Sequence, residues 1–149
     1  HIERVFDAPR ELVWEAFTDP DQISQWFGPV GYSVPRETVE VDLRVGGHQK
    51  LTMVPDSPDY PSGGPSDGVF DEIVEHELLV MHEDLEGEMA ELFGSNRLDI
   101  RIELHDENGK TRLVVRQGPY KDDFVGMARE GWTSSFTKLD ELLASTKAS

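Results

Sequence analysis

The chain has 149 residues with thirty acidic and fourteen basic side chains, so its formal charge at pH 7 is −16. This charge disfavours nucleic acid and anionic membrane surfaces as partners, because like charges raise the free energy of approach. The absence of cysteine excludes disulfides and thiolate chemistry, and no apolar stretch approaches the ~20 residues that span a bilayer. We therefore expect a single acidic, cytoplasmic domain over residues 1–149, without membrane insertion.

The first elements predicted in chain order are a strand over residues 2–6 and two short helices. The first helix starts near Pro9, which fits the opening turn of a helix. It ends before Pro20, because a proline disfavours the helical conformation in the residue before it. The second helix spans residues 21–26 and ends in a loop.

Trp26 and Phe27 stand where this second helix gives way to Gly28-Pro29. Large apolar groups at a loop exit are costly unless something covers them. We predict that these two aromatic side chains form a lid or the opening of a cavity.

The middle of the chain switches to the period-two alternation of antiparallel strands, with turns at Gly46-Gly47 and Asn108-Gly109. Residues 55–68 contain four prolines and three glycines, so we predict a loop there. Residues 84–96 are ambiguous between a loop and one helical turn. The predicted strands are 37–44, 48–54, 69–74, 78–82, 98–105 and 111–117.

The last predicted element is one long helix over residues 120–143, whose apolar side chains recur at spacings of three and four. Gly131 lies in this stripe beside Trp132 and near Phe136, and a small residue there lets a neighbouring surface or a ligand approach the helix closely. The stripe either only covers a sheet or also lines a cavity. Both interpretations stay open at this point.

Strands grouped apart from helices indicate an α+β domain. About six or seven antiparallel strands that curve around the long C-terminal helix, with two short helices near the N-terminus, would cover every apolar face.

Four segments occur in the order typical of the START-like superfamily, also called helix-grip or SRPBCC: DAPRELVWEAFTDPDQISQWFGP, VDLRVGGHQKLTM, GVFDEIVEHELLVMHED and GWTSSFTKLDELL. More narrowly, the chain resembles bacterial stand-alone homologues of the activator of the 90-kDa heat-shock protein ATPase. The resemblance covers nearly the whole chain and implies the helix-grip fold. It implies no single function, because this superfamily includes ligand carriers, cyclases, aromatases and co-chaperone domains.

The predicted function is binding of a hydrophobic or amphipathic small molecule in a cavity between the sheet and the C-terminal helix. Aromatic side chains and adaptable methionines on the facing elements support it. No nucleotide-binding, metal-binding or catalytic motif occurs in the sequence, so we predict no cofactor, no metal and no catalytic residue. The residues expected to line the cavity are Trp26, Phe27, Met53, Phe70, His82, Ile100, Phe124, Met127, Gly131, Trp132 and Phe136.

Two other functions remain open. An enzyme of the cyclase or hydrolase type would use the same cavity walls and one group that moves a proton. The candidates for that group are His82, Arg101, Tyr32 and Tyr120. A protein-interaction module that contacts a chaperone follows from the resemblance alone, and a homodimer is left open as well.

Overall fold

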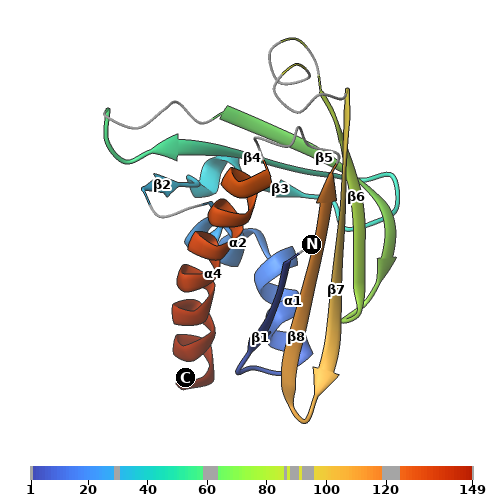
Figure 1. Cartoon of the computed structure of the whole chain (residues 1–149), viewed down its shortest axis with the longest axis vertical. Coiled ribbons are helices and arrows are strands. Elements are labelled where there is room, and N and C mark those ends of the chain that lie inside the picture. The colour runs from blue at the N-terminus through green and yellow to red at the C-terminus, as the bar shows by residue number, and fades with distance from the viewer. Residues whose placement is uncertain are drawn as a thin grey trace.

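The computed structural model describes residues 2–28, 31–58, 64–85, 87, 91, 96–118 and 125–148, with the backbone alone at 64–65, 125–128 and 146–148. The predicted order of a strand, two short helices, a run of strands and one long helix is confirmed (Figure 1). The elements are β1 (Ile2–Phe6), α1 (Arg10–Thr18), α2 (Pro20–Trp26), β2 (Tyr32–Ser33), the 3-10 helix η1 (Arg36–Thr38), β3 (Glu40–Val41), β4 (His48–Pro55), β5 (Gly64–Val74), β6 (Leu78–Asp84), β7 (Arg97–Glu107), β8 (Lys110–Gly118) and α4 (Val125–Ala148).

The strands form one antiparallel sheet in the order β1-β8-β7-β6-β5-β4-β2, with β3 paired to β4. In Figure 1 the strands turn from the steep β7 and β8 to the nearly horizontal β4, so the sheet is strongly curved and α4 lies on its concave side. This is the predicted α+β helix-grip arrangement. Within the described residues the sheet has eight strands, of which β2 and β3 are only two residues long.

The core lies where the concave face of the sheet meets α1, α2 and α4. Side chains alternate along each strand, so residues that are opposite one another in the register share a face. Burial of each large side chain stabilises the fold by roughly 1.5–3 kcal/mol. The buried residues of this core include Phe6, Val13, Phe17, Trp26, Phe70, Leu79, Ile102, Leu113, Val115, Phe136 and Leu139.

Local signals define the two short helices, and a buried hydrogen bond joins them. Pro20 opens α2, and the Asp19 carboxylate accepts a hydrogen bond from the backbone N–H of Asp21 at 2.9 Å. The indole Nε1 of Trp26 donates to the carbonyl oxygen of Ala16 at 2.7 Å. Because Ala16 lies in the last turn of α1, this bond fixes α2 against α1.

β5 begins at Gly64, so the prediction of a loop throughout residues 55–68 was wrong for residues 64–68. Those residues pair with β4, which itself continues to Pro55. Pro65 is tolerated because β6 pairs with β5 only from Val69 onward, so this stretch has a ladder partner on one side only. Residues 59–63 lie outside the described part of the chain.

The strand predicted over residues 37–44 is reduced to β3. The preceding residues form η1, and Arg44 then donates its backbone N–H to the Asp42 carbonyl at 2.8 Å in a turn. Val39 is buried, whereas Leu43 is 42% exposed. The alternating pattern therefore continues beyond the residues that have a partner strand.

α4 continues to Ala148, beyond the predicted end at residue 143. The additional residues contain neither glycine nor proline, so no backbone signal ends the helix there. The predicted start at residue 120 lies outside the described residues.

A bulge at Asp71 changes which residues of β5 reach the core. The register between β5 and β6 shifts between Phe70 and Glu72. Phe70 and Ile73 therefore both pack into the core despite their three-residue spacing, because the extra residue resets the alternation.

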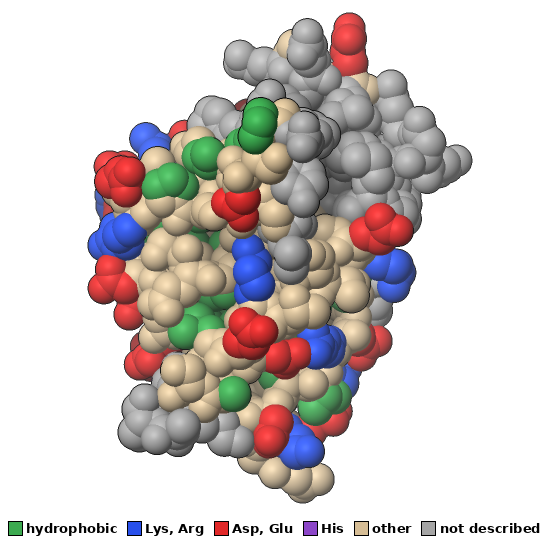
Figure 2. Space-filling view, turned by 90° about the vertical axis from the view of Figure 1, so that its left-hand side faces the viewer, with side chains coloured by type: hydrophobic (Ala, Val, Ile, Leu, Met, Phe, Trp, Pro, Cys, Tyr) green, Lys and Arg blue, Asp and Glu red, His purple; other side chains and the backbone are tan. Residues whose placement is uncertain are grey.

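Figure 2 shows acidic and basic side chains interspersed on the side of the molecule where α4 and β2 lie in Figure 1. Among the described residues, no helix combines the length and the apolar character needed to cross a membrane.

Substitutions at Gly46 and Gly47 test the steric constraint on the turn between β3 and β4. A Cβ there would stand 2.1 Å from the Asp42 carbonyl oxygen, whereas a Cβ at Gly46 would meet none of the described residues within 4 Å. Gly46 has a φ of +86°, so Gly46→Ala should cost about 1–2 kcal/mol through backbone strain alone. We expect Gly47→Ala to lower the free energy of unfolding in urea by more than Gly46→Ala does, and equal losses would contradict the steric argument.

Candidate functional site

Six aromatic rings run in continuous contact from α1 to β1 through the space between the sheet and α4. Successive rings meet edge-on or tilted, the preferred geometry for aromatic pairs. Their centroid separations are 4.9 Å for Phe17 and Trp26, 5.4 Å for Trp26 and Phe27, 6.1 Å for Phe27 and Trp132, 5.8 Å for Trp132 and Phe136, and 5.3 Å for Phe136 and Phe6.

The rings at the two ends of this series are buried, but Phe27 and Trp132 in its middle are only half-buried. Met53 on β4 and Ile100 on β7 are half-buried apolar side chains that also pack against the core. Together with Gln117 on β8 they form the concave-face group, defined as Phe27, Met53, Ile100, Gln117 and Trp132.

Contacts connect this group from one side to the other. Phe27 meets Trp132, whose indole Nε1 donates to Gln117 Oε1 at 2.8 Å. Gln117 lies opposite Ile100 in the pairing of β7 with β8. Met53 reaches the loop after α2, because its Sδ would lie 3.4 Å from a Cβ at Gly28. Five different segments therefore contribute to one incompletely covered apolar surface.

Lys138 ties α4 to the loop that carries Phe27. Its Nζ donates to the carbonyl oxygens of Phe27 at 3.5 Å and Tyr32 at 3.2 Å. Burial lowers the pKa of this ammonium group, while the charge of Asp56 acts in the opposite direction. The contact holds Phe27 close to Trp132, since both ends of the segment 27–32 are bound to the same helix.

Gly131 lies on the same line of α4 as Lys138, because seven residues make about two helical turns. Apart from its chain neighbours and the backbone of α4, none of the described residues comes within 4 Å of the position where its Cβ would stand. As far as the described residues extend, this part of α4 therefore has room for a larger side chain next to Trp132.

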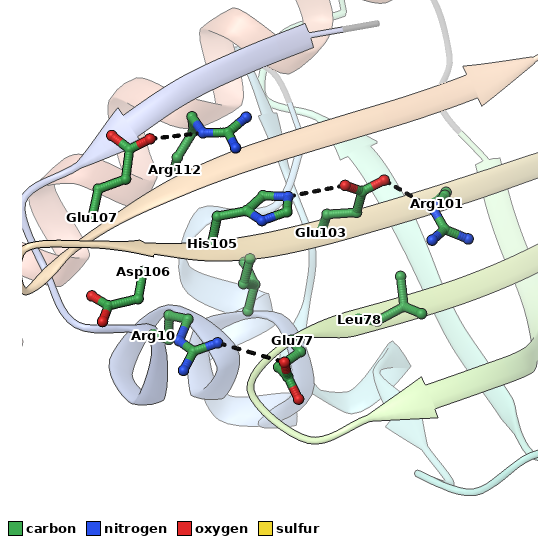
Figure 3. Close-up of a pocket in the computed structure, with 10 residues that line it drawn as sticks. Arg10, Glu77, Leu78, Arg101, Glu103, His105, Asp106, Glu107 and Arg112 are labelled. Carbon is green, nitrogen blue, oxygen red and sulfur yellow. Dashed lines mark hydrogen bonds and ion pairs between the residues drawn. The ribbon is translucent and has the colours of Figure 1, made fainter.

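A depression of about 400 Å³ lies along the C-terminal half of β7 beside the start of α1 (Figure 3). Figure 3 shows Glu103 between Arg101 and His105, with Arg10 directed toward Glu77. Arg101 Nε donates to Glu103 Oε2 at 2.9 Å, and the bond between His105 Nε2 and Glu103 Oε1 is also 2.9 Å. These charged groups satisfy one another, so we interpret this depression as an ion-pair network and not as the binding site.

Among the described residues, no group of three or more histidine, aspartate or glutamate side chains is arranged to hold a metal ion. The concave-face group also contains no nucleophile and no acid or base. What it offers chemically is an apolar surface with one polar amide.

Comparison with known proteins places the chain in a family. Residues 7–144 match the family model described as activator of Hsp90 ATPase homolog 1-like protein. The chain belongs to this family. Its membership confirms the resemblance to the START-like superfamily and to bacterial homologues of the ATPase activator.

Solved structures of bacterial proteins share the fold. Protein NE0264 from Nitrosomonas europaea is 26% identical, with 99% of this chain and 95% of that chain covered and a TM-score of 0.77. Protein CV1439 from Chromobacterium violaceum is 24% identical, with 95% and 94% covered and a TM-score of 0.79. The AHSA1 (SPO3351) protein from Silicibacter pomeroyi is 22% identical, with 96% and 95% covered and a TM-score of 0.75. Among proteins of curated function, none matches this chain.

The structure brings together most of the residues that were predicted to line a cavity, but it separates His82 from them. Phe27, Met53, Ile100 and Trp132 are in the concave-face group, and Gly131 adjoins it. Trp26, Phe70 and Phe136 lie deeper, within the core. Phe124 and the side chain of Met127 lie outside the described residues. That these side chains enclose a ligand stays a prediction.

His82 lies on the opposite face of the sheet. It follows Met81, which is buried in the core, and successive side chains of a strand point to opposite faces. On that other face its Nδ1 is 2.8 Å from Asp71 Oδ2, and Asp71 also approaches Arg97 at 3.6 Å. This placement gives His82 a carboxylate partner away from the concave-face group.

The sequence analysis did not include Gln117 among the candidate site residues, although the pattern of its strand contains a signal for it. Gln117 is in phase with Leu113 and Val115, two residues that are buried in the core. A polar residue that continues the inward phase of a strand is informative, because burying an amide without a partner is costly.

Glu103 offers a pH test of the ion-pair network. Hydrogen bonds from Arg101 and His105, with a smaller contribution from Arg116, lower the pKa of this carboxyl from its ordinary value of 4.5. A carboxyl whose pKa is lowered by folding stabilises the protein above the unfolded-state pKa and loses that contribution as pH falls through the folded-state pKa.

We therefore expect Glu103→Gln to lower the free energy of unfolding at pH 7 by about 1–2 kcal/mol, since charge-assisted hydrogen bonds are lost from a side chain that is 17% exposed. The difference from the unmodified protein should shrink as the pH falls below 4.5. Urea titrations at several pH values measure this difference in the free energy of unfolding. Glu72→Gln, at an exposed residue without an ion pair in the described part, is the matched control, and a difference independent of pH would contradict the assignment.

Proposed function

We propose that this protein binds a largely apolar small molecule between the concave face of the sheet and the N-terminal half of α4. The observation that carries the proposal is the concave-face group, in which four apolar side chains from separate elements touch the core and remain half-buried. Family membership supports the proposal, because the START-like scaffold accommodates ligand carriers.

The energetics favour a ligand at this surface. Each Å² of apolar surface removed from water contributes about 25 cal/mol, so covering four half-buried side chains is favourable. Buried rings behind Phe27 and Trp132, together with the Lys138 contacts, hold the two aromatic side chains in place before a ligand arrives. A preformed surface avoids part of the entropic cost of binding.

Binding is favoured over turnover, because the five side chains of the concave-face group include no nucleophile, acid or base, and the Glu83 carboxylate on the same face of the sheet accepts hydrogen bonds from Ser66 and Asp67. His82, the best sequence candidate for an acid or base, is on the other face of the sheet. Arg101 is paired with Glu103 in the separate ion-pair network.

Gly131→Leu tests the position of the site. The added side chain would occupy the open space beside Trp132, so we expect the affinity for the neutral dye N-phenyl-1-naphthylamine to fall at least tenfold. Thr133→Leu adds a side chain of the same kind on the exposed side of α4 and should leave the affinity within about twofold, because exposed positions of a helix do not contact the site. Dye fluorescence measures both affinities.

Native mass spectrometry of the freshly purified protein gives an independent test. A mass that is lost on denaturation would identify a retained ligand and support the proposal. Failure of the dye to bind the unmodified protein, or equal affinity of the Gly131→Leu and Thr133→Leu variants, would overturn the proposed site.

A chaperone contact is the second candidate, supported by the description of the family as homologues of an ATPase activator. We propose it as an additional role of the surface and not of the concave-face group. Its test is the ATPase rate of the host's 90-kDa heat-shock protein, and an unchanged rate at saturating concentration would exclude it. The native mass spectrum also counts subunits, which tests a homodimer.

A further inference from the structure

We propose that Gln117 selects the ligand by donating a hydrogen bond to an acceptor oxygen, so that the bound molecule is an uncharged, largely apolar compound with a carbonyl group. This inference rests on the proposed function and names the chemical class of the ligand. The observation behind it is an amide on the concave face whose oxygen accepts a hydrogen bond and whose NH2 group meets no acceptor among the described residues.

The hydrogen bond from Trp132 fixes the orientation of the Gln117 amide. An indole Nε1–H only donates, so the atom that it meets at 2.8 Å must be the carbonyl oxygen Oε1. The NH2 group of Gln117 therefore occupies the other side of the amide. The described residues provide no acceptor for it, although two N–H donors are present there.

The position of Gln117 brings this donor to the ligand surface. Gln117 is half-buried and lies opposite Ile100 in the register. The indole of Trp132 joins it from α4. A ligand that covers Ile100 and Trp132 would also displace water from the Gln117 NH2 group, and an unpaired donor is costly once water is excluded. An acceptor oxygen on the ligand removes that cost.

Charge restricts the class of acceptor to neutral oxygens. Glu83 lies in the concave-facing phase of β6, two residues after Met81, and its carboxylate accepts hydrogen bonds from the Ser66 hydroxyl and the Asp67 N–H, both at 3.2 Å. The net charge of −16 on the whole chain also disfavours an anionic ligand, and the nearby Lys138 ammonium already donates to the carbonyl oxygens of Phe27 and Tyr32. Ketone, ester and amide carbonyls accept a hydrogen bond and carry no charge.

The experiment compares 2-acetylnaphthalene with 2-ethylnaphthalene, which have nearly the same shape and differ in the carbonyl oxygen. Isothermal titration calorimetry or quenching of tryptophan fluorescence gives both affinities. We expect the unmodified protein to bind the ketone roughly fivefold to tenfold more tightly, the effect of one net hydrogen bond.

Gln117→Glu removes the donor and keeps an acceptor for the Trp132 indole. The preference for the ketone should disappear in this variant. Gln25→Glu, on the exposed face of α2, changes the net charge by the same amount and should retain the preference. Gln117→Met, which has similar length and no charge, gives a second measurement if the glutamate variant does not fold.

The outcomes separate this inference from the proposed function. Equal affinity of both compounds for the unmodified protein, or a preference that survives in the Gln117 variants, would overturn the role of Gln117 while the binding site stands. If neither compound binds, the proposed function fails and this inference fails with it.

Discussion

The packing of α4 against the concave face of the sheet is the interaction on which the rest of the structure depends. Phe136 meets Phe6 of β1 edge-on at 5.3 Å, and Leu139 and Leu143 are buried along the same stripe. The ion pair between Arg4 and Asp140 lies beside this contact. A sheet with one apolar face needs such a cover, and its curvature lets strands at both ends contact one helix.

The same helix also links the core to the proposed binding surface. Phe136, Leu139 and Leu143 on one side of α4 are buried, whereas Trp132 and Gly131 nearer the N-terminus remain half-buried. Because a helix is rigid over a few turns, packing of these buried side chains sets where Trp132 stands relative to Phe27 and Gln117. The surface that we propose for a ligand is thus positioned by buried residues that are not part of it, such as Phe136 behind Trp132.

Local sequence patterns predicted the types and order of the elements, but they did not place every residue on a face. The run from Leu78 to Met81 is apolar at every position, so it carries no alternation from which the side of His82 follows. The strand character of residues 64–68 was missed for another reason, since those residues are rich in glycine and proline and pair only because β4 lies alongside. The pairing of each strand with its neighbour, and not the propensity of its residues, decided the face of His82 and the strand structure of residues 64–68.

The sequence by itself predicted the types and order of the elements, because hydrophobic periodicity and turn residues act over a few neighbouring positions, and its resemblance to a known family implied their helix-grip arrangement. It also indicated Phe27, Met53, Ile100 and Trp132 as cavity candidates from their residue types. Only the tertiary structure showed that Trp132 donates to Gln117 and leaves the amide NH2 without a described acceptor. That contact joins a helix to a strand, and its geometry depends on how the whole stripe of α4 docks on the curved sheet.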